Sequence, residues 1–196
     1  MLFLDYLFVD NYLQLSLLMV IVFIASIVRG CIGFGLSVLG VASTSFWLEI
    51  KYVVVVVVLL ELLASLVMIK AVREEIDFHI FTMLSISGVV SSVIGVWFLV
   101  ILDKPIHQFM ISVYLLAIVT LVLSRFMFRK PINSLRLFMI GSVAGFYNGL
   151  AGIGGIFVAT MLTSSRVQVK HIRATVVVYF FLVEAVFFAA AAYNDL

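Results

Sequence analysis

The sequence predicts an all-α polytopic membrane protein built from two inverted repeats, each opening with a re-entrant helix pair that glycines break. Three observations predict this fold class. The 196 residues are 65% hydrophobic and only 11% charged, whereas a soluble domain is about 45–50% apolar and about 25% charged. Apolar segments long enough to cross a bilayer recur along the chain. Two glycine clusters, 119 residues apart, interrupt these apolar segments.

The composition also excludes several classes of function. The net charge of +2 comes from 12 basic and 10 acidic residues spread along the chain, so no basic patch for nucleic acid is present. The single cysteine, Cys31, cannot form an internal disulfide or a zinc site. The sequence contains no nucleophile–base pair and no metal-ligand cluster. We therefore expect no enzymatic activity, no cofactor, no metal and no nucleic-acid partner.

Eight apolar segments are expected to be helices, because lipid cannot satisfy the backbone polar groups of an open sheet. This holds even for the six-valine run Val53–Val58, which would favour a strand in water. The segments cover residues 12–28, 31–48, 52–69, 80–102, 106–128, 135–147, 150–162 and 174–192.

The two glycine clusters share one ungapped register. Gly30, Gly33 and Gly35 fall on Gly149, Gly152 and Gly154, and the match continues from Thr44-Ser45 to Thr163-Ser164 and from Lys51 to Lys170. We interpret this register as an internal repeat. The chain is then a single transmembrane domain, residues 1–196, with a first repeat over 12–128 and a second over 135–196.

Each glycine cluster divides about thirty apolar residues, and one continuous helix of that length would reach about 45 Å, beyond the roughly 30 Å hydrocarbon core. Either one long span is broken, or two half-helices form a hairpin that enters and leaves on one side. If both clusters form hairpins, nine lysine and arginine residues lie on one side of the membrane and only Lys51 and Lys104 lie on the other. If both clusters are single crossings, five of these residues lie on one side and six on the other. The nine are Lys70, Arg73, Arg125, Arg129, Lys130, Arg136, Arg166, Lys170 and Arg173.

Basic residues favour the cytoplasmic side of a membrane, so the hairpin arrangement is preferred. It predicts a multi-pass protein of the inner membrane with its N-terminus outside. Each complete repeat then has an odd number of crossings, which inverts the second repeat relative to the first. The second repeat reaches Leu196 after its hairpin and one span. We expect it to lack two spans, which a homo-oligomer or a partner chain would complete.

The second glycine cluster lies in Gly145-Phe146-Tyr147-Asn148-Gly149-Leu150-Ala151-Gly152-Ile153-Gly154-Gly155-Ile156-Phe157, and Gly30-Cys31-Ile32-Gly33-Phe34-Gly35-Leu36 is a degenerate copy of it. With these motifs the chain resembles the sulfite exporter TauE/SafE family along nearly its whole length. The resemblance implies export of a small sulfur-containing anion, sulfite or an organosulfonate.

The same clusters are candidates for an anion site. Helix N-termini attract anions, and glycine lets a ligand approach the backbone closely. Arg29 adds a guanidinium suited to oxyanions, and Asn148 takes the equivalent place in the second repeat. The alternative is that the glycines only permit tight packing, as we expect for the face of Gly88, Ser92 and Gly95. The candidate substrate-binding residues are Arg29, Gly30, Gly33, Gly35, Asn148, Gly149, Gly152, Gly154 and Gly155.

Two carboxylates, Glu61 and Glu184, lie near the middle of their spans, where a charge is costly and usually functional. Glu184 corresponds to Ser65 in the first repeat, one helical turn from Glu61 and on the same face. Either the two carboxylates couple transport to protons, or Glu61 forms a fixed ion pair with Arg29. Glu184 has no obvious partner, and His107 is expected to be solvated beside a loop.

The sequence therefore predicts a secondary transporter that moves a small anion through the lipid bilayer between two glycine-broken hairpins, with proton coupling. Two other functions stay open. A passive anion channel would share the broken helices, and a non-transporting membrane subunit or assembly partner would fit the missing spans.

Overall fold

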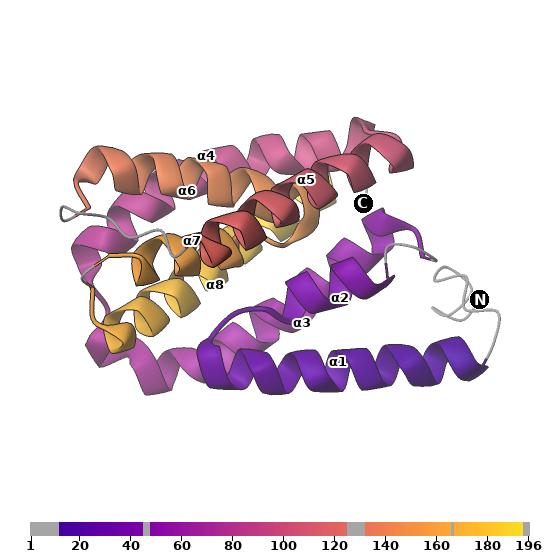
Figure 1. The fold of residues 1–196 in the computed structure, drawn as a ribbon, viewed down its shortest axis with the longest axis horizontal. Coiled ribbons are helices and arrows are strands. Elements are labelled where there is room, and N and C mark those ends of the chain that lie inside the picture. Colours follow the sequence, from indigo (N-terminus) through magenta and orange to yellow (C-terminus); the bar gives the residue numbers. More distant parts are fainter. Residues whose placement is uncertain (1–11, 45–47, 125–131, 166, 194–196) are drawn as a thin grey trace.

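The computed structural model describes residues 12–44, 48–124, 132–165 and 167–193, and within these ranges it contains helices and no strand. The prediction of an all-α fold is confirmed. Figure 1 shows the arrangement of the elements. In chain order they are α1 (Tyr12–Ile32), α2 (Leu36–Thr44), α3 (Ile50–Val72), η2 (Arg73–Glu75), α4 (Phe78–Ile101), α5 (Lys104–Leu123), α6 (Ser134–Ala151), α7 (Gly155–Thr163) and α8 (Val169–Tyr193).

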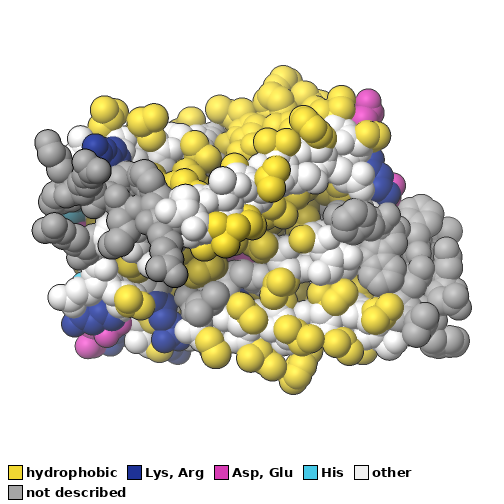
Figure 2. All heavy atoms as spheres, in the orientation of Figure 1, with side chains coloured by type: hydrophobic (Ala, Val, Ile, Leu, Met, Phe, Trp, Pro, Cys, Tyr) yellow, Lys and Arg dark blue, Asp and Glu magenta, His cyan; other side chains and the backbone are white. Residues whose placement is uncertain are grey.

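Four of the described helices are long and apolar enough to cross a membrane. They are α3, which continues through η2, and α4, α5 and α8. They overlap four of the apolar segments expected to be helices, residues 52–69, 80–102, 106–128 and 174–192. Their outward sides carry large apolar side chains, such as Val67, which is 80% exposed, and Leu123, which is 76% exposed. Hydrophobic side chains accordingly cover much of the face drawn in Figure 2. The chain is a polytopic membrane protein.

Two short helices, α2 and α7, have nine residues each and follow α1 and α6. In Figure 1, α2 turns back beside α1 and α7 turns back toward the start of α6, so each pair forms a hairpin. Nine residues reach about 14 Å, roughly half of the hydrocarbon core. The prediction that both members of a hairpin are half-helices is wrong for the first member, because α1 has 21 residues and α6 has 18.

The helix breaks lie later in each glycine cluster than the sequence suggested. Gly30 and Gly149 lie inside α1 and α6, since one glycine costs a helix only about 1 kcal/mol. The chain leaves the helix at Gly33 and Gly152, whose φ angles are 87° and 70°. A left-handed backbone at these two positions favours glycine over residues with a Cβ.

The element boundaries recur at a single spacing. Ile32 and Ala151 end α1 and α6, Leu36 and Gly155 begin α2 and α7, Thr44 and Thr163 end α2 and α7, and Ile50 and Val169 begin α3 and α8. Each second member lies 119 residues after the first, which is the spacing of the glycine clusters.

The most extensive contact between helices joins α4 and α6, and small residues form it. A Cβ on Gly149 would overlap the backbone of Ser92, one on Gly145 would overlap Gly88, and one on Gly95 would overlap the carbonyl of Phe146. The predicted packing role of Gly88, Ser92 and Gly95 is confirmed. These contacts let the two backbones approach closely, as small residues do in membrane helices.

Candidate functional site

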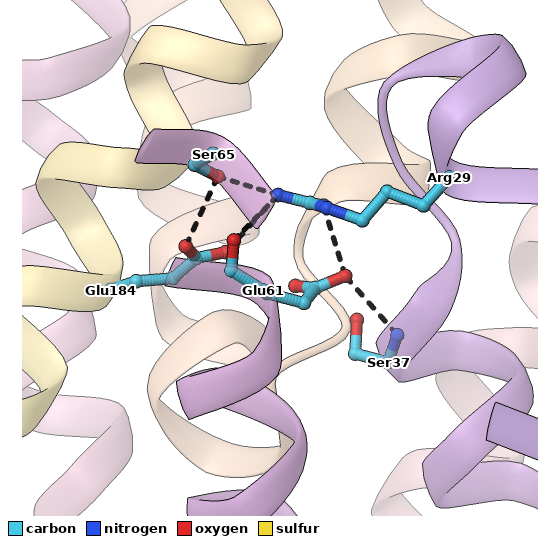
Figure 3. A network of polar contacts seen from close by, with 5 residues as sticks. All are labelled: Arg29, Ser37, Glu61, Ser65 and Glu184. Atoms are coloured by element: carbon cyan, nitrogen blue, oxygen red, sulfur yellow. Dashed lines mark hydrogen bonds and ion pairs between the residues drawn. The ribbon is translucent and has the colours of Figure 1, made fainter. Parts of the chain in front are cut away.

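Arg29 lies in the last turn of α1 and is only 1% exposed. Its Nη1 donates a hydrogen bond to Glu61 Oε1 at 3.0 Å. Its Nη2 donates to the backbone oxygen of Glu61 at 3.1 Å and to Ser65 Oγ at 2.6 Å. Figure 3 shows the guanidinium reaching from the tip of the first hairpin toward α3. The ion pair with Glu61, one of the two predicted possibilities, is present.

Glu61 also receives a hydrogen bond from the N-terminus of α2. The backbone N–H of Ser37, the second residue of α2, donates to Glu61 Oε1 at 3.1 Å. A helix N-terminus and a guanidinium therefore meet at one carboxylate oxygen, which is the chemistry that favours an anion. Here the anion is a side chain of the protein itself.

Glu184 reaches the same cluster from α8 and is fully buried. Ser65 Oγ donates to Glu184 Oε2 at 3.4 Å, and Glu184 Oε1 lies 3.9 Å from Arg29 Nη2. The expectation that Glu184 has no partner is wrong, because α8 packs against α3 and brings Glu184 beside Ser65. Figure 3 shows the Glu184 carboxyl group next to Ser65 and the Glu61 carboxyl group next to the Arg29 guanidinium.

The cluster leaves several polar atoms unpaired. Among the described residues, Arg29 Nε, Glu61 Oε2 and Glu184 Oε1 are buried side-chain atoms without a hydrogen-bond partner. The network is therefore only partly satisfied. Buried atoms of this kind are costly and mark a site that can form further hydrogen bonds, with Arg29 Nε as donor and the carboxylate oxygens as acceptors.

Phe180 completes the surroundings of Arg29 and was missed in the sequence. Its ring centroid lies 5.6 Å from Arg29 Cζ, within the range of a cation–π contact. The signal was available, because Phe180 occupies the position 119 residues after Glu61. The same position thus carries an acid in one half of the chain and an aromatic ring in the other.

Asn148 lies on α6 and is fully buried, but it does not hydrogen-bond Arg29. Its Oδ1 and Nδ2 are both without a hydrogen-bond partner within the described part of the chain. The predicted amide of the second repeat is thus buried and unpaired. Its role in holding an anion stays a prediction.

The candidate glycines divide into two groups. Gly33, Gly35 and Gly152 lie at the helix breaks and have positive φ angles, and Gly30 has open space where a Cβ would point. Gly149, Gly154 and Gly155 lie in packing contacts, where a Cβ would overlap the Ser92 carbonyl, the Ala144 carbonyl and the Phe180 ring respectively. Anion binding by either group stays a prediction.

The second break is held by two side chains of α5. His107 Nε2 donates to the backbone oxygen of Leu150 at 2.8 Å, and Tyr114 Oη donates to that of Ile153 at 3.3 Å. The expectation that His107 is solvated is wrong, since it is only 2% exposed. Carbonyls at the end of a helix lack partners inside it, and α5 supplies these partners.

Within the described ranges, no group of three or more histidine, cysteine, aspartate or glutamate side chains is placed to hold a metal ion. The strongest chemical feature of the described chain is the buried cluster of Arg29, Glu61, Ser65 and Glu184.

Comparison with known proteins gives one match. No curated protein and no solved structure matches the chain. The family model described as "Sulfite exporter TauE/SafE" matches residues 18–196, a range that contains every residue of the buried cluster. This is a family of membrane transporters, and the chain belongs to the sulfite exporter TauE/SafE family.

Proposed function

We propose that this protein is a secondary transporter of a small oxyanion, sulfite or an organosulfonate, and that Arg29 binds the anion. The observation that carries the proposal is the place of Arg29. Arg29 is 1% exposed and lies at the end of α1, next to the first helix break. Its guanidinium and the backbone N–H of Ser37 in α2 both donate to Glu61 Oε1. Intramembrane charges at helix breaks are typical of transporter binding sites.

The acceptor to be replaced is the Glu61 carboxylate. Arg29 Nη1 and the Ser37 N–H both donate to Glu61 Oε1, at 3.0 and 3.1 Å. An oxygen of a sulfite or sulfonate group accepts the same two hydrogen bonds. We infer that the substrate and Glu61 alternate as acceptors of these two hydrogen bonds. The structure then corresponds to the state in which Glu61 accepts both of them.

Charge balance connects this exchange to protons. The cluster holds one guanidinium and two carboxyl groups, all at most 1% exposed, and an uncompensated charge there is costly. One proton on the Glu61–Glu184 pair makes the cluster neutral. When a monovalent anion takes over Arg29, a second proton restores neutrality. Anion binding is thereby linked to uptake of one proton.

We further propose that the two halves are inverted repeats. Besides the element boundaries, paired contacts support this. A Cβ on Gly33 would lie 3.3 Å from a Val177 methyl, and one on Gly152 would lie 2.9 Å from a Val58 methyl. Each residue of the second pair is the 119-residue equivalent of one in the first. A two-fold relation between halves produces such exchanged pairs of contacts.

The chain directions support the proposed topology. In Figure 1 the connection between α3 and α4 and the starts of α6 and α8 lie at one end of the molecule, and the connection between α4 and α5 lies at the other. The first end carries Lys70, Arg73, Arg136, Lys170 and Arg173, and the second carries Lys51 and Lys104. Arg125, Arg129, Lys130 and Arg166 lie outside the described residues. We propose that the first end is cytoplasmic and the N-terminus is outside, in the inner membrane.

The test is transport in proteoliposomes containing the purified protein and radiolabelled sulfite or ethanesulfonate. Saturable flux in the wild type that is lost in Arg29→Gln supports the proposal. Flux that rises linearly with concentration indicates a passive channel, and absence of wild-type flux of both anions indicates a subunit that does not transport. Unchanged flux in Arg29→Gln removes the assigned role of Arg29.

A further inference from the structure

A pocket of roughly 260 Å³ opens where the end of α1 meets the end of α7 and the start of α8. Phe34, Ile172 and Val176 form apolar walls, and Cys31, Thr163 and Arg173 add polar or reactive groups. Arg173 is the charged residue among the described residues that line it. The pocket thus presents a cation and a hydroxyl within an otherwise apolar surface.

Arg173 lines this pocket and is held by a hydrogen bond to the end of α1. Its Nη2 donates to the backbone oxygen of Gly30 at 3.2 Å, and its side chain remains exposed. Its Cγ lies 3.3 Å from where a Cβ on Gly33 would be. Because Gly33 has no side chain, the Arg173 stem fits against the helix break. The guanidinium is therefore fixed one residue from Cys31 and four residues after Val169, the start of α8.

The pocket and the buried cluster follow one another along a single face of α8. Val176 lines the pocket, Phe180 follows one turn later, and Glu184 follows one turn after that. Val176 and Glu184 are about 12 Å apart along the helix axis. Along α8, Phe180, whose ring is 1% exposed and packed over Arg29, comes between Val176 of the pocket and Glu184 of the cluster.

We propose that this pocket is an entry site, on the cytoplasmic side, for a small oxyanion on its way to Arg29. Arg173 is the first cationic contact of the anion, and Phe180 is the barrier between the entry site and Arg29. The inference rests on the proposed function, because it gives the transported anion its route. A guanidinium beside apolar walls suits an anion that carries a short apolar portion.

Cys31 allows a direct test, because it lines the pocket, is exposed and is the single cysteine of the chain. Thiol modification is measured with two membrane-impermeant methanethiosulfonates of similar size, the anionic sulfonatoethyl and the cationic trimethylammonioethyl reagent. Wild-type protein is compared with Arg173→Gln, with Arg173→Lys, and with Lys170→Gln as matched control. Lys170 is exposed on the same helix and does not line the pocket. The Cys31→Ser variant gives the background.

We expect both reagents to reach Cys31 from the cytoplasmic side only, and ethanesulfonate to slow the anionic reagent. Arg173→Gln should lower the ratio of anionic to cationic rate about fivefold or more, because one nearby charge acts in opposite directions on the two reagents. Lys170→Gln and Arg173→Lys should change the ratio less than about twofold at moderate salt. Modification from the outer side, no modification at all, or an unchanged ratio in Arg173→Gln overturns the inference.

The labelling result is independent of the transport result. Loss of the charge preference in Arg173→Gln is measured without any flux, so it tests the pocket alone. If Arg29→Gln keeps full transport while the Cys31 pattern is as expected, the role of Arg29 fails and the pocket stands. If Arg29→Gln loses transport and the ratio of anionic to cationic rate at Cys31 is unchanged in Arg173→Gln, the proposed pocket site is wrong and the role of Arg29 stands.

Discussion

Ser65 Oγ donates a hydrogen bond to Glu184 Oε2 at 3.4 Å, although the two residues are 119 positions apart. This separation equals the offset between the glycine clusters, so Ser65 and Glu184 hold equivalent positions in the two halves. Equivalent residues that touch each other lie next to the axis relating the halves. The proposed two-fold axis therefore passes beside the Arg29 guanidinium, which donates to Ser65 from the other side.

The two halves nevertheless differ in chemistry at this axis. The first contributes Arg29 and Glu61, and the second contributes Asn148 and Phe180 at the equivalent positions. One arginine-centred cluster is therefore built on a repeated backbone arrangement. We infer that this asymmetry leaves the buried cluster with one arginine, Arg29, instead of two.

Replacing both Glu61 and Glu184 by Gln should remove the pH dependence of anion binding. In the wild type, binding takes up a proton, so the apparent affinity for ethanesulfonate should fall as pH rises, by up to about tenfold per pH unit. With amides at both positions the cluster has no carboxyl group left to take up a proton, and the affinity should become flat with pH. Ethanesulfonate suits the measurement because its own charge does not change near neutral pH.

The matched control for this prediction is Glu49→Gln. Glu49 is also a glutamate, but it is exposed and 3.4 Å from Lys104 at the opposite end of the molecule from Lys70. It should leave the pH profile of the wild type unchanged. A double variant that retains the wild-type slope would show that Glu61 and Glu184 are not the coupling groups.

Two candidate glycines should respond in opposite ways to alanine. A Cβ at position 149 would overlap the backbone of Ser92, so Gly149→Ala should destabilise the α4–α6 contact by about 1–3 kcal/mol. A Cβ at position 30 meets no atom within 4 Å, so Gly30→Ala should raise stability by up to about 1 kcal/mol, because alanine is the better helix former. Thermal unfolding in detergent measures both. Equal effects would mean that close packing does not explain the glycines of α6.

Single cysteines in the Cys31→Ser background test the proposed topology. Cysteines replacing Lys70 and Lys170 should react with an impermeant thiol reagent from the cytoplasmic side, and a cysteine replacing Asp103 should react from the outside. This pattern follows from a hairpin of α6 and α7 that returns to the side from which it entered. Finding positions 70 and 170 on opposite sides would rule out the re-entrant arrangement.

The sequence was sufficient for the features that depend on local chemistry and spacing. Length and hydropathy identified the four spans, and the register of Gly33 with Gly152 identified the paired hairpins. Placing Glu61 and Ser65 on one helical face was also correct, since both contact Arg29. Each of these features depends on residues close together in the chain or on helical periodicity.

The features that depend on packing between helices were not predictable in this way. Phe180 lies over Arg29 because α8 packs against α3. The repeat register pairs position 180 with Glu61, but it does not specify an aromatic contact with Arg29. His107 is buried because α5 lies against the second helix break. The exact residue at which α1 ends depends on whether packing and hydrogen bonding stabilise the helix by more than the low helix propensity of Gly30 destabilises it.

The proposed alternation of an anion and Glu61 on Arg29 is tested most directly by a charge-balanced double variant. Removing Arg29 alone leaves buried carboxylates uncompensated and should cost about 3–5 kcal/mol. Arg29→Gln combined with Glu61→Gln removes one charge of each sign and should restore much of that stability. The measurement is saturable flux of radiolabelled sulfite into proteoliposomes by this double variant. We predict a stable protein without flux; flux at the wild-type rate would contradict the account.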